Sequence, residues 1–222
     1  MSERPQAVLW DFDGTMVDSS EHWFAAEVEV MRGLGASWTL ADSHALEGVN
    51  LVDGLTFMLA QAGRPELDPT PFVDQLVVAA AASMGRAEPK WRPGVKALLA
   101  ELRRADLPLG LVTASYAPIL DAALAHLPRG TFATVVPGDA VTRGKPHPEP
   151  YLTACARLGV DPRRVIVIED SVTGVAAGRA AGSFVVAINF RSEHADAPGL
   201  MVTGSLEAIT WSGVEESWRA WA

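Results

Sequence analysis

The sequence predicts an α/β protein with a doubly wound parallel sheet and a small, all-helical cap domain. Short runs of aliphatic and β-branched residues alternate with segments of helical periodicity, which is the pattern of a parallel sheet covered by helices. One long stretch after the first strand-like run has helical periodicity without a strand. The 222 residues of the chain suffice for one such sheet and a smaller second domain.

The elements of the core follow one another in a regular order. The predicted buried strands are Ala7–Trp10, Leu107–Val112, Thr134–Val136, Arg164–Ile168 and Phe184–Ile188. Helical periodicity marks residues 94–104, 117–126, 149–159 and 172–182. Ligands bind at the carboxyl ends of the strands in sheets of this kind, so the residues that follow the strands are the first candidates for a site.

The helical insertion is predicted to span residues 20–86, which leaves residues 1–19 and 87–222 for the core. Its helical runs are Trp23–Met31, Leu51–Ala62 and Phe72–Met84. Pro89 and Pro93 mark its exit, because proline restricts the backbone ahead of a new helix. The insertion interrupts the core directly after the first strand, so we expect it to cover the carboxyl end of that strand.

Bulk properties exclude several classes of partner. The net charge is −9 and the sequence has no basic patch, which argues against nucleic acid. No apolar run approaches the roughly 18 residues that cross a bilayer, and the first residues lack a signal-like apolar segment. We therefore expect a soluble, cytoplasmic protein without a membrane partner, either a monomer or a weak homodimer.

The cysteine and the C-terminal tryptophans are predicted to pack in the interior and to take no part in a functional site. The single cysteine, Cys155, cannot form an intrachain disulfide and lies on a predicted amphipathic helix, so we expect a buried thiol. Trp211, Trp218 and Trp221 share one helical face by their spacing. We expect them to pack on the core, with an exposed interface as the alternative.

Asp11 and Asp13 end the first strand and are the first candidates for chemistry. Side chains two apart on a strand project to the same side, so the two carboxylates face one site. Gly14 permits a close backbone approach, and the loop after it can direct amide N–H groups at an anion. Two close carboxylates call for a cation or for acid/base work. The alternative is a pair of solvated aspartates in a turn.

Later strand ends supply hydroxyl groups and a cation. Thr113, Ala114 and Ser115 follow the second predicted strand, and the small hydroxyl side chains of Thr113 and Ser115 suit hydrogen bonds to phosphate oxygens. Lys145 stands ahead of a proline-rich turn and a helix, where an ammonium can neutralise a phosphate and a carboxylate together.

The strand that ends near Ile168 supplies two more carboxylates. Glu169 and Asp170 follow it, and Gly174 allows close packing beside them. Mg²⁺ prefers oxygen ligands and is usually held by one or two carboxylates together with a substrate phosphate. Asp11 and Asp170 fit that count.

The order of these groups resembles the haloacid dehalogenase superfamily, in particular its members with a helical cap after the first motif and a Rossmann-like core. The resemblance covers nearly the whole chain. Its four motifs match Asp11-Phe12-Asp13-Gly14-Thr15, Thr113, Lys145 and Glu169-Asp170. Four motifs at successive strand ends are far more specific than any one of them.

The resemblance implies a phosphate-ester hydrolase. Asp11 would attack phosphorus and form an aspartyl phosphate. Asp13 would protonate the leaving oxygen and then take a proton from the attacking water. Thr113 and Lys145 would fix the transferring phosphoryl group, with Gly14, Ala114 and Ser115 as further phosphate contacts.

The resemblance also implies Mg²⁺ as cofactor and a small-molecule phosphate ester as substrate. The ion would be held by the Asp11 carboxylate, the Asp13 backbone carbonyl and Asp170, with Glu169 as a ligand or as support.

Among capped relatives the chain looks like β-phosphoglucomutase and the small-molecule phosphatases near it. A histidine of the mutase cap falls at Trp23, beside His22, and two cations that hold the sugar phosphate fall near Glu47 and Leu51. Loss of these cations favours hydrolysis over the mutase reaction, and the mutase stays as the alternative.

Two further alternatives come from other classes. Dehalogenases lack the second aspartate, so Asp13 argues against that activity. A protein that only binds a partner would be expected to lose a catalytic group.

Several cap residues are candidates to face the leaving group. They are His22, Trp23, His44, Glu47, Asn50 and Asp53. Acidic residues among them would repel a second phosphate, which points weakly to a neutral or cationic leaving group.

Overall fold

The computed structural model describes residues 4–46, 48–189 and 197–222, and within them the chain divides into two compact units. The first, which we call the core unit, contains the chain up to Asp18 together with Lys90–Ser115 and Pro128–Ala222. The second, the helical unit, contains Ser19–Pro89 and Tyr116–Leu127. The two units are described separately.

The core unit is built on a six-stranded sheet in the order β3-β2-β1-β4-β5-β6, with every neighbouring pair parallel. Its strands are β1 Ala7–Trp10, β2 Leu109–Val112, β3 Thr134–Val136, β4 Val165–Glu169, β5 Phe184–Ile188 and β6 Leu200–Thr203. Strand β1 is central, because Leu9 pairs with Gly110 of β2 on one side and with Val167 of β4 on the other.

The five strands predicted from the sequence are all present, and β6 was missed. Strands β1, β2, β4 and β5 are buried along their whole length, which explains their uninterrupted apolar sequences. Strand β6 lies at the edge of the sheet and is partly exposed, so its sequence carries a weaker signal. The structure also places Glu169 inside β4 as its last residue, where the sequence predicted a loop position.

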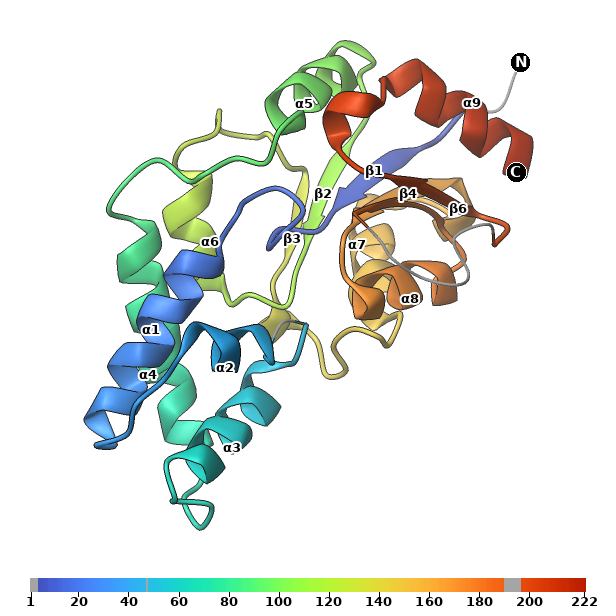
Figure 1. Ribbon diagram of the computed structural model, residues 1–222. Coiled ribbons are helices and arrows are strands. Elements are labelled where there is room, and N and C mark those ends of the chain that lie inside the picture. Colours follow the sequence, from blue (N-terminus) through green and yellow to red (C-terminus); the bar gives the residue numbers. More distant parts are fainter. Residues whose placement is uncertain (1–3, 47, 190–196) are drawn as a thin grey trace. The chain divides into compact units, whose positions relative to one another are not determined.

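Four helices cover the two faces of this sheet. They are α5 Val95–Arg104, α7 Glu149–Leu158, α8 Val172–Ala180 and α9 Trp211–Trp221. Helices α7 and α8 contact each other and the strands β2 to β5, whereas α9 contacts α5 and β5. Figure 1 shows the two pairs on opposite faces of the sheet, so the predicted doubly wound architecture is confirmed. Short 3₁₀ turns occupy Gly138–Ala140, Pro162–Arg164 and Leu206–Ala208.

In the part of the helical unit that the structure describes there are five helices. They are α1 Ser20–Gly33, α2 Leu40–His44, α3 Leu51–Gln61, α4 Thr70–Met84 and α6 Ala117–Leu124. Helix α4 is the centre of the unit, because it contacts α1, α3 and α6. The sequence predicts α6 as part of the core, but its buried face packs on α4, so a segment far along the chain joins the unit that begins at Ser19. Helix α2 was not predicted because it is only five residues long; a capping box between Thr39 and Asp42 starts it.

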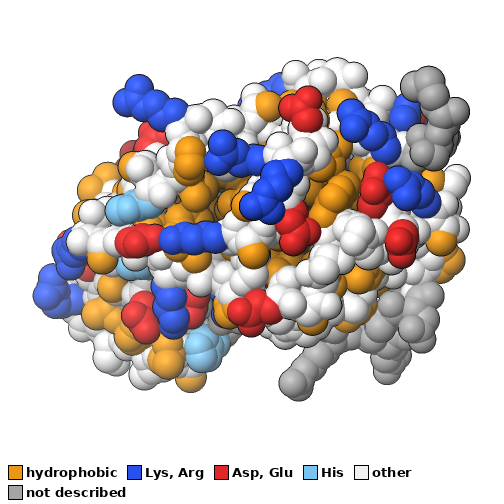
Figure 2. Space-filling view, turned by 90° about the horizontal axis from the view of Figure 1, so that it is seen from above, with side chains coloured by type: hydrophobic (Ala, Val, Ile, Leu, Met, Phe, Trp, Pro, Cys, Tyr) orange, Lys and Arg blue, Asp and Glu red, His pale blue; other side chains and the backbone are white. Residues whose placement is uncertain are grey.

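The surface in view carries charges of both signs, and the single cysteine is buried. Among the described residues, no helix combines the length and the apolar character needed to span a membrane. On the face shown in Figure 2, lysine and arginine side chains alternate with aspartate and glutamate. Cys155 is free and buried, as predicted, and burial raises the pKa of its thiol to about 11.

The C-terminal tryptophans anchor α9 on the core unit. Trp218 is fully buried, and the ring of Trp221 lies 5.7 Å from that of Phe184 in β5. Packing on the core, as predicted, is confirmed for these two side chains. Helix α9 thus packs against β5 in the core unit.

Truncation of Trp218 should therefore destabilise the core. We expect W218A to lower the free energy of unfolding by about 3–5 kcal/mol, because a large buried side chain leaves a cavity that the surroundings fill only in part. Urea denaturation would measure the loss, with V172A as control, since Val172 is 68% exposed. A loss in W218A no larger than in V172A would contradict this account of the core.

Candidate active site

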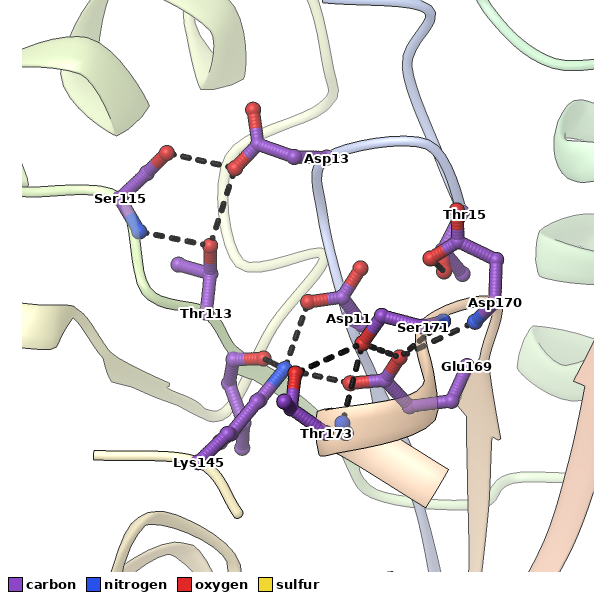
Figure 3. A network of polar contacts seen from close by, with 12 residues as sticks. Asp11, Asp13, Thr15, Thr113, Ser115, Lys145, Glu169, Asp170, Ser171 and Thr173 are labelled. Carbon is purple, nitrogen blue, oxygen red and sulfur yellow. Dashed lines mark hydrogen bonds and ion pairs between the residues drawn. The ribbon is translucent and has the colours of Figure 1, made fainter. Parts of the chain in front are cut away.

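The polar residues of the core unit meet at the carboxyl ends of β1, β2 and β4, which are neighbours in the sheet. Asp11 comes directly after β1, and its backbone N–H donates to the carbonyl of Ile168 in β4 at 3.0 Å. The strand pairing therefore still holds the backbone at the position where the first carboxylate appears. Figure 3 shows these side chains converging from the three strand ends.

Lys145 lies between two buried carboxylates. Its ammonium donates to Asp11 Oδ1 at 2.6 Å, to Glu169 Oε1 at 2.6 Å and to the carbonyl oxygen of Val112 at 3.0 Å. Its side chain is 7% exposed. Burial by itself lowers the pKa of Lys145, but the two carboxylates outweigh it and raise the pKa above its ordinary value. The group therefore stays an ammonium and links the ends of β1, β2 and β4.

Glu169 accepts hydrogen bonds at both carboxylate oxygens. Oε1 accepts from Lys145 and from the hydroxyl of Tyr151 at 2.8 Å. Oε2 accepts from the backbone N–H of Asp170 at 3.0 Å, and from the backbone N–H and hydroxyl of Ser171 at 3.1 and 3.0 Å. The residue is completely buried. Five donors leave little acceptor capacity for a metal ion, which favours support over direct ligation.

Gly174 makes room for this carboxylate. A Cβ added there would lie 1.7 Å from Glu169 Oε1, far inside any real contact. The sequence prediction that Gly174 allows close packing is confirmed. Ser171 begins α8 by accepting from the N–H of Gly174 at 3.0 Å, so the same turn holds Glu169 and starts the helix.

Asp170 lies against the loop that follows β1. Its Oδ1 accepts from the hydroxyl of Thr15 at 2.8 Å. Gly14 has a φ of +80°, and a Cβ there would lie 2.1 Å from Asp170 Oδ2, so glycine is needed both for the backbone conformation and for the approach of this carboxylate. The N–H of Gly14 donates to Val17 within the loop at 2.8 Å. A phosphate contact by Gly14 stays a prediction.

The carboxylates on this side form an oxygen-rich cluster. Asp11, Glu169 and Asp170 each offer an oxygen, and these atoms lie within 4.8 Å of one another. Burial, followed by the charge of Glu169, raises the pKa of Asp11 well above its ordinary value and that of Asp170 to about 6. Lys145 supplies one positive charge against three carboxylates. A further cation would offset this excess, and an oxygen-only donor set suits Mg²⁺, so these residues fit the ion.

Asp13 belongs to a second set of contacts, at the end of β2. Its Oδ2 accepts from the hydroxyl of Ser115 at 2.5 Å and from that of Thr113 at 3.2 Å. The Thr113 hydroxyl in turn accepts from the N–H of Ser115 at 3.0 Å. Both hydroxyl residues are almost fully buried. The structure thus brings Thr113 and Ser115 to the second aspartate, and Figure 3 shows Asp13 directed away from the Lys145 ammonium.

The turn between Thr113 and Ser115 is packed closely against the loop after β3. A Cβ at Gly138 would lie 2.2 Å from the carbonyl oxygen of Ala114, and the N–H of Gly138 donates to the carbonyl of Ser115 at 2.9 Å. This packing fixes the backbone of Ala114, the residue predicted as a further phosphate contact.

The described residues of the helical unit that were predicted to face the leaving group have hydrogen-bond or other partners of several kinds. Asn50 caps α3, with its side-chain oxygen accepting from the N–H of Asp53 at 3.0 Å and its side-chain nitrogen donating to the carboxylate of Asp53 at 2.5 Å. These two residues therefore have a local structural role. His22 Nδ1 lies 2.9 Å from the hydroxyl of Ser83. Trp23 and His44 also have partners, and Glu47 lies outside the described residues.

The sequence analysis missed three residues of the site. Thr15 and Ser171 stand within or next to the quoted motifs, so their hydroxyls could have been considered from position alone. Tyr151 lies on α7, six residues beyond Lys145, and carried no signal beyond helical periodicity. Helical periodicity predicts that such a side chain is buried, and it does not predict its hydrogen-bond partner.

The fold and this strand edge define an α/β enzyme suited to an anionic substrate, with carboxylates and an ammonium where strands end. Residues 8–188 match the family model described as haloacid dehalogenase-like hydrolase. The chain therefore belongs to the haloacid dehalogenase-like hydrolase family, and the resemblance inferred from four motifs is confirmed.

Comparison with individual proteins agrees with this assignment. Hexitol phosphatase A of Escherichia coli (strain K12) is 34% identical over 216 residues, which cover 93% of this chain and 94% of that protein. N-acetylmuramic acid 6-phosphate phosphatase of Pseudomonas aeruginosa is 32% identical over 201 residues, covering 86% and 84%. These matches and the family model make the chain a phosphoric monoester hydrolase.

A solved structure supports the fold over nearly the whole chain. The crystal structure of β-phosphoglucomutase from Clostridium difficile superposes with a TM-score of 0.82 at 20% identity, and the match covers 97% of this chain and 98% of that one. At this identity the likeness concerns the fold, which is the predicted core with its helical insertion.

Substitution of Gly174 should disturb the site through Glu169. We expect G174A to lower the free energy of unfolding by about 1–3 kcal/mol, the range for overpacking, because the new Cβ overlaps a buried carboxylate. Thermal or urea unfolding would measure it. G33A is the matched control, since nothing lies within 4 Å of a Cβ at Gly33. Equal stability of the two variants would show that the Glu169 turn can relax at no cost.

Proposed function

We propose that this chain is a Mg²⁺-dependent phosphatase that hydrolyses a small phosphorylated sugar or polyol through an aspartyl-phosphate intermediate. The observation that carries the proposal is the buried Asp11 carboxylate at the end of β1, held by the Lys145 ammonium at 2.6 Å. A carboxylate in this position can act as a nucleophile, and an ammonium beside it can stabilise negative charge that develops on a phosphoryl group.

The first half of the reaction transfers the phosphoryl group to the protein. A carboxylate oxygen of Asp11 forms a bond to phosphorus while the ester P–O bond breaks. Asp13, in its protonated form, gives its proton to the leaving oxygen, so the product leaves as an alcohol. Hydrolysis follows: a water gives a proton to Asp13 and attacks phosphorus, the bond to Asp11 breaks, and inorganic phosphate is released.

The remaining predicted residues fit supporting roles. The Thr113 hydroxyl and the Lys145 ammonium would bind phosphoryl oxygens, with the backbone at Ala114 and Ser115 as further contacts. The hydroxyls of Thr113 and Ser115 donate to Asp13, so they would also orient the acid/base carboxylate.

Mg²⁺ would be held by the carboxylates of Asp11 and Asp170 and by the backbone carbonyl of Asp13, with Glu169 as support. When bound, the ion would supply positive charge that offsets the clustered carboxylates and the substrate phosphate. The Thr15 hydroxyl keeps Asp170 turned toward the loop after β1.

The substrate class is supported by the relatives. A hexitol phosphatase and an N-acetylmuramic acid 6-phosphate phosphatase are each more than 30% identical to this chain over most of its length, and both names specify phosphorylated polyols or sugars. A phosphate-release screen over hexitol phosphates, sugar phosphates, phosphoglycolate, nucleotides and pyrophosphate, with Mg²⁺ and with a chelator, would test the proposal.

Asp11 is the residue to remove first. In that screen we expect release from a sugar or polyol phosphate by the wild-type protein with Mg²⁺, and loss of release with chelator and in D11N. Asparagine has nearly the same shape as aspartate, so circular dichroism should show a folded variant. Mg²⁺-dependent release by D11N would exclude the nucleophile, and conversion of a sugar 1-phosphate to the 6-phosphate without release would identify a mutase instead.

Asp13 should affect both halves of the reaction. We expect D13N to lower kcat by about 10²–10⁴-fold, the usual contribution of a positioned acid/base group. Single-turnover kinetics with mass spectrometry of the intact protein would follow the phosphorylated intermediate. Loss of a group that transfers a proton should lower kcat by far more than twofold. A kcat of D13N within about twofold of the wild type would therefore remove Asp13 from the mechanism.

A further inference from the structure

Tyr151 is a buried phenol that touches both members of the central ion pair. It lies on α7 and is fully buried. Its hydroxyl donates to Glu169 Oε1 at 2.8 Å, and the Lys145 ammonium lies 5.2 Å from the centre of its ring. Tyr151 is not part of the four motifs, and it plays no part in the reaction as proposed above.

The position of the Lys145 ammonium is a balance between two carboxylates. It lies at the same distance, 2.6 Å, from Asp11 Oδ1 and from Glu169 Oε1. Opposite charges attract strongly in a buried site, so a change in either carboxylate shifts the ammonium. Val112 accepts the third hydrogen bond and does not compensate for such a change.

The Tyr151 hydroxyl binds one of these two carboxylates, that of Glu169. Glu169 Oε1 divides its acceptor capacity between the Tyr151 hydroxyl and the ammonium. The donors of the turn that begins α8 are bound to Glu169 Oε2, so they do not replace the Tyr151 hydroxyl as a donor to Oε1. Because Glu169 is completely buried, water does not replace a lost donor without a rearrangement.

The contacts of Tyr151 assign it the part of a positioning residue, which keeps the Lys145 ammonium shared between Glu169 and Asp11. This inference rests on the proposed function for its catalytic consequence. Without the hydroxyl, Oε1 attracts the ammonium more strongly, and Lys145 moves toward Glu169 and away from Asp11. The nucleophile then loses part of the charge that orients it and that stabilises the transferring phosphoryl group.

The ring of Tyr151 has a separate effect from the hydroxyl. It fills the space beneath the ammonium and contributes a weak cation–π contact. Phenylalanine keeps the ring and the volume and removes the hydroxyl, so Y151F isolates the hydrogen bond to Glu169. Cys155 lies on the same helix and is equally buried, but it contacts no residue of the ion pair in any described interaction. C155A is therefore a matched control for disturbance of α7.

The test compares the wild-type protein, Y151F and C155A. We expect Y151F to lower kcat about tenfold, equivalent to about 1.4 kcal/mol of transition-state stabilisation, with KM changed less than about twofold. C155A should lower the melting temperature, because it removes a buried side chain from α7, and leave kcat unchanged. Equal kcat in Y151F and the wild type, or equal losses of kcat in Y151F and C155A, would overturn the positioning role.

Crystal structures of the wild-type protein and Y151F give a readout that does not depend on turnover. We expect the distance from Lys145 Nζ to Asp11 Oδ1 to exceed hydrogen-bond range, above about 3.2 Å, in Y151F only. An unchanged distance would overturn the inference. If the wild-type protein releases phosphate from no ester, the proposed function fails, and this distance still decides whether Tyr151 sets the position of Lys145.

Discussion

The structure of the site depends on one buried ammonium shared by two carboxylates. Lys145 connects Asp11 after β1, Glu169 at the end of β4 and the last carbonyl of β2, and it uses its three N–H groups to do so. Only a sheet in which β2, β1 and β4 are neighbours brings these three acceptors within reach of a single side chain. The order of the strands in the sheet therefore determines which charged groups meet at the site, and we treat the two as one constraint.

That constraint leaves the site short of positive charge. Asp11, Glu169 and Asp170 gather within 4.8 Å of one another, and burial and mutual repulsion raise the pKa of Asp11 and Asp170. Such a cluster is costly by itself, and a divalent cation with oxygen ligands would offset its excess of negative charge. The same repulsion that makes the cluster costly would therefore favour the binding of a cation there.

The two aspartates of the first motif are separated by their partners. Asp11 is held by an ammonium, and Asp13 is held by the hydroxyls of Thr113 and Ser115. A nucleophile needs to be ionised, and the Lys145 ammonium favours the ionised form of Asp11 against the burial that raises its pKa. An acid/base group must gain and lose a proton, so the two carboxylates need different surroundings. Gly14 and Gly174 allow this crowding, because each stands where a Cβ would overlap a carboxylate.

The sequence by itself determined the alternation of strands and helices, the positions of Asp11 and Thr113 directly after strands, the position of Lys145 ahead of a helix, and the family. These properties depend on local periodicity and on short motifs. Both can be read from a short stretch of sequence without knowledge of the rest of the fold. Tertiary structure decided that α6 packs with α4, that β6 adds an edge strand, that Ser115 binds Asp13 and that Tyr151 binds Glu169. These are contacts between segments distant in the chain. Periodicity shows that such side chains are buried, but their partners are fixed only when the sheet and its helices come together.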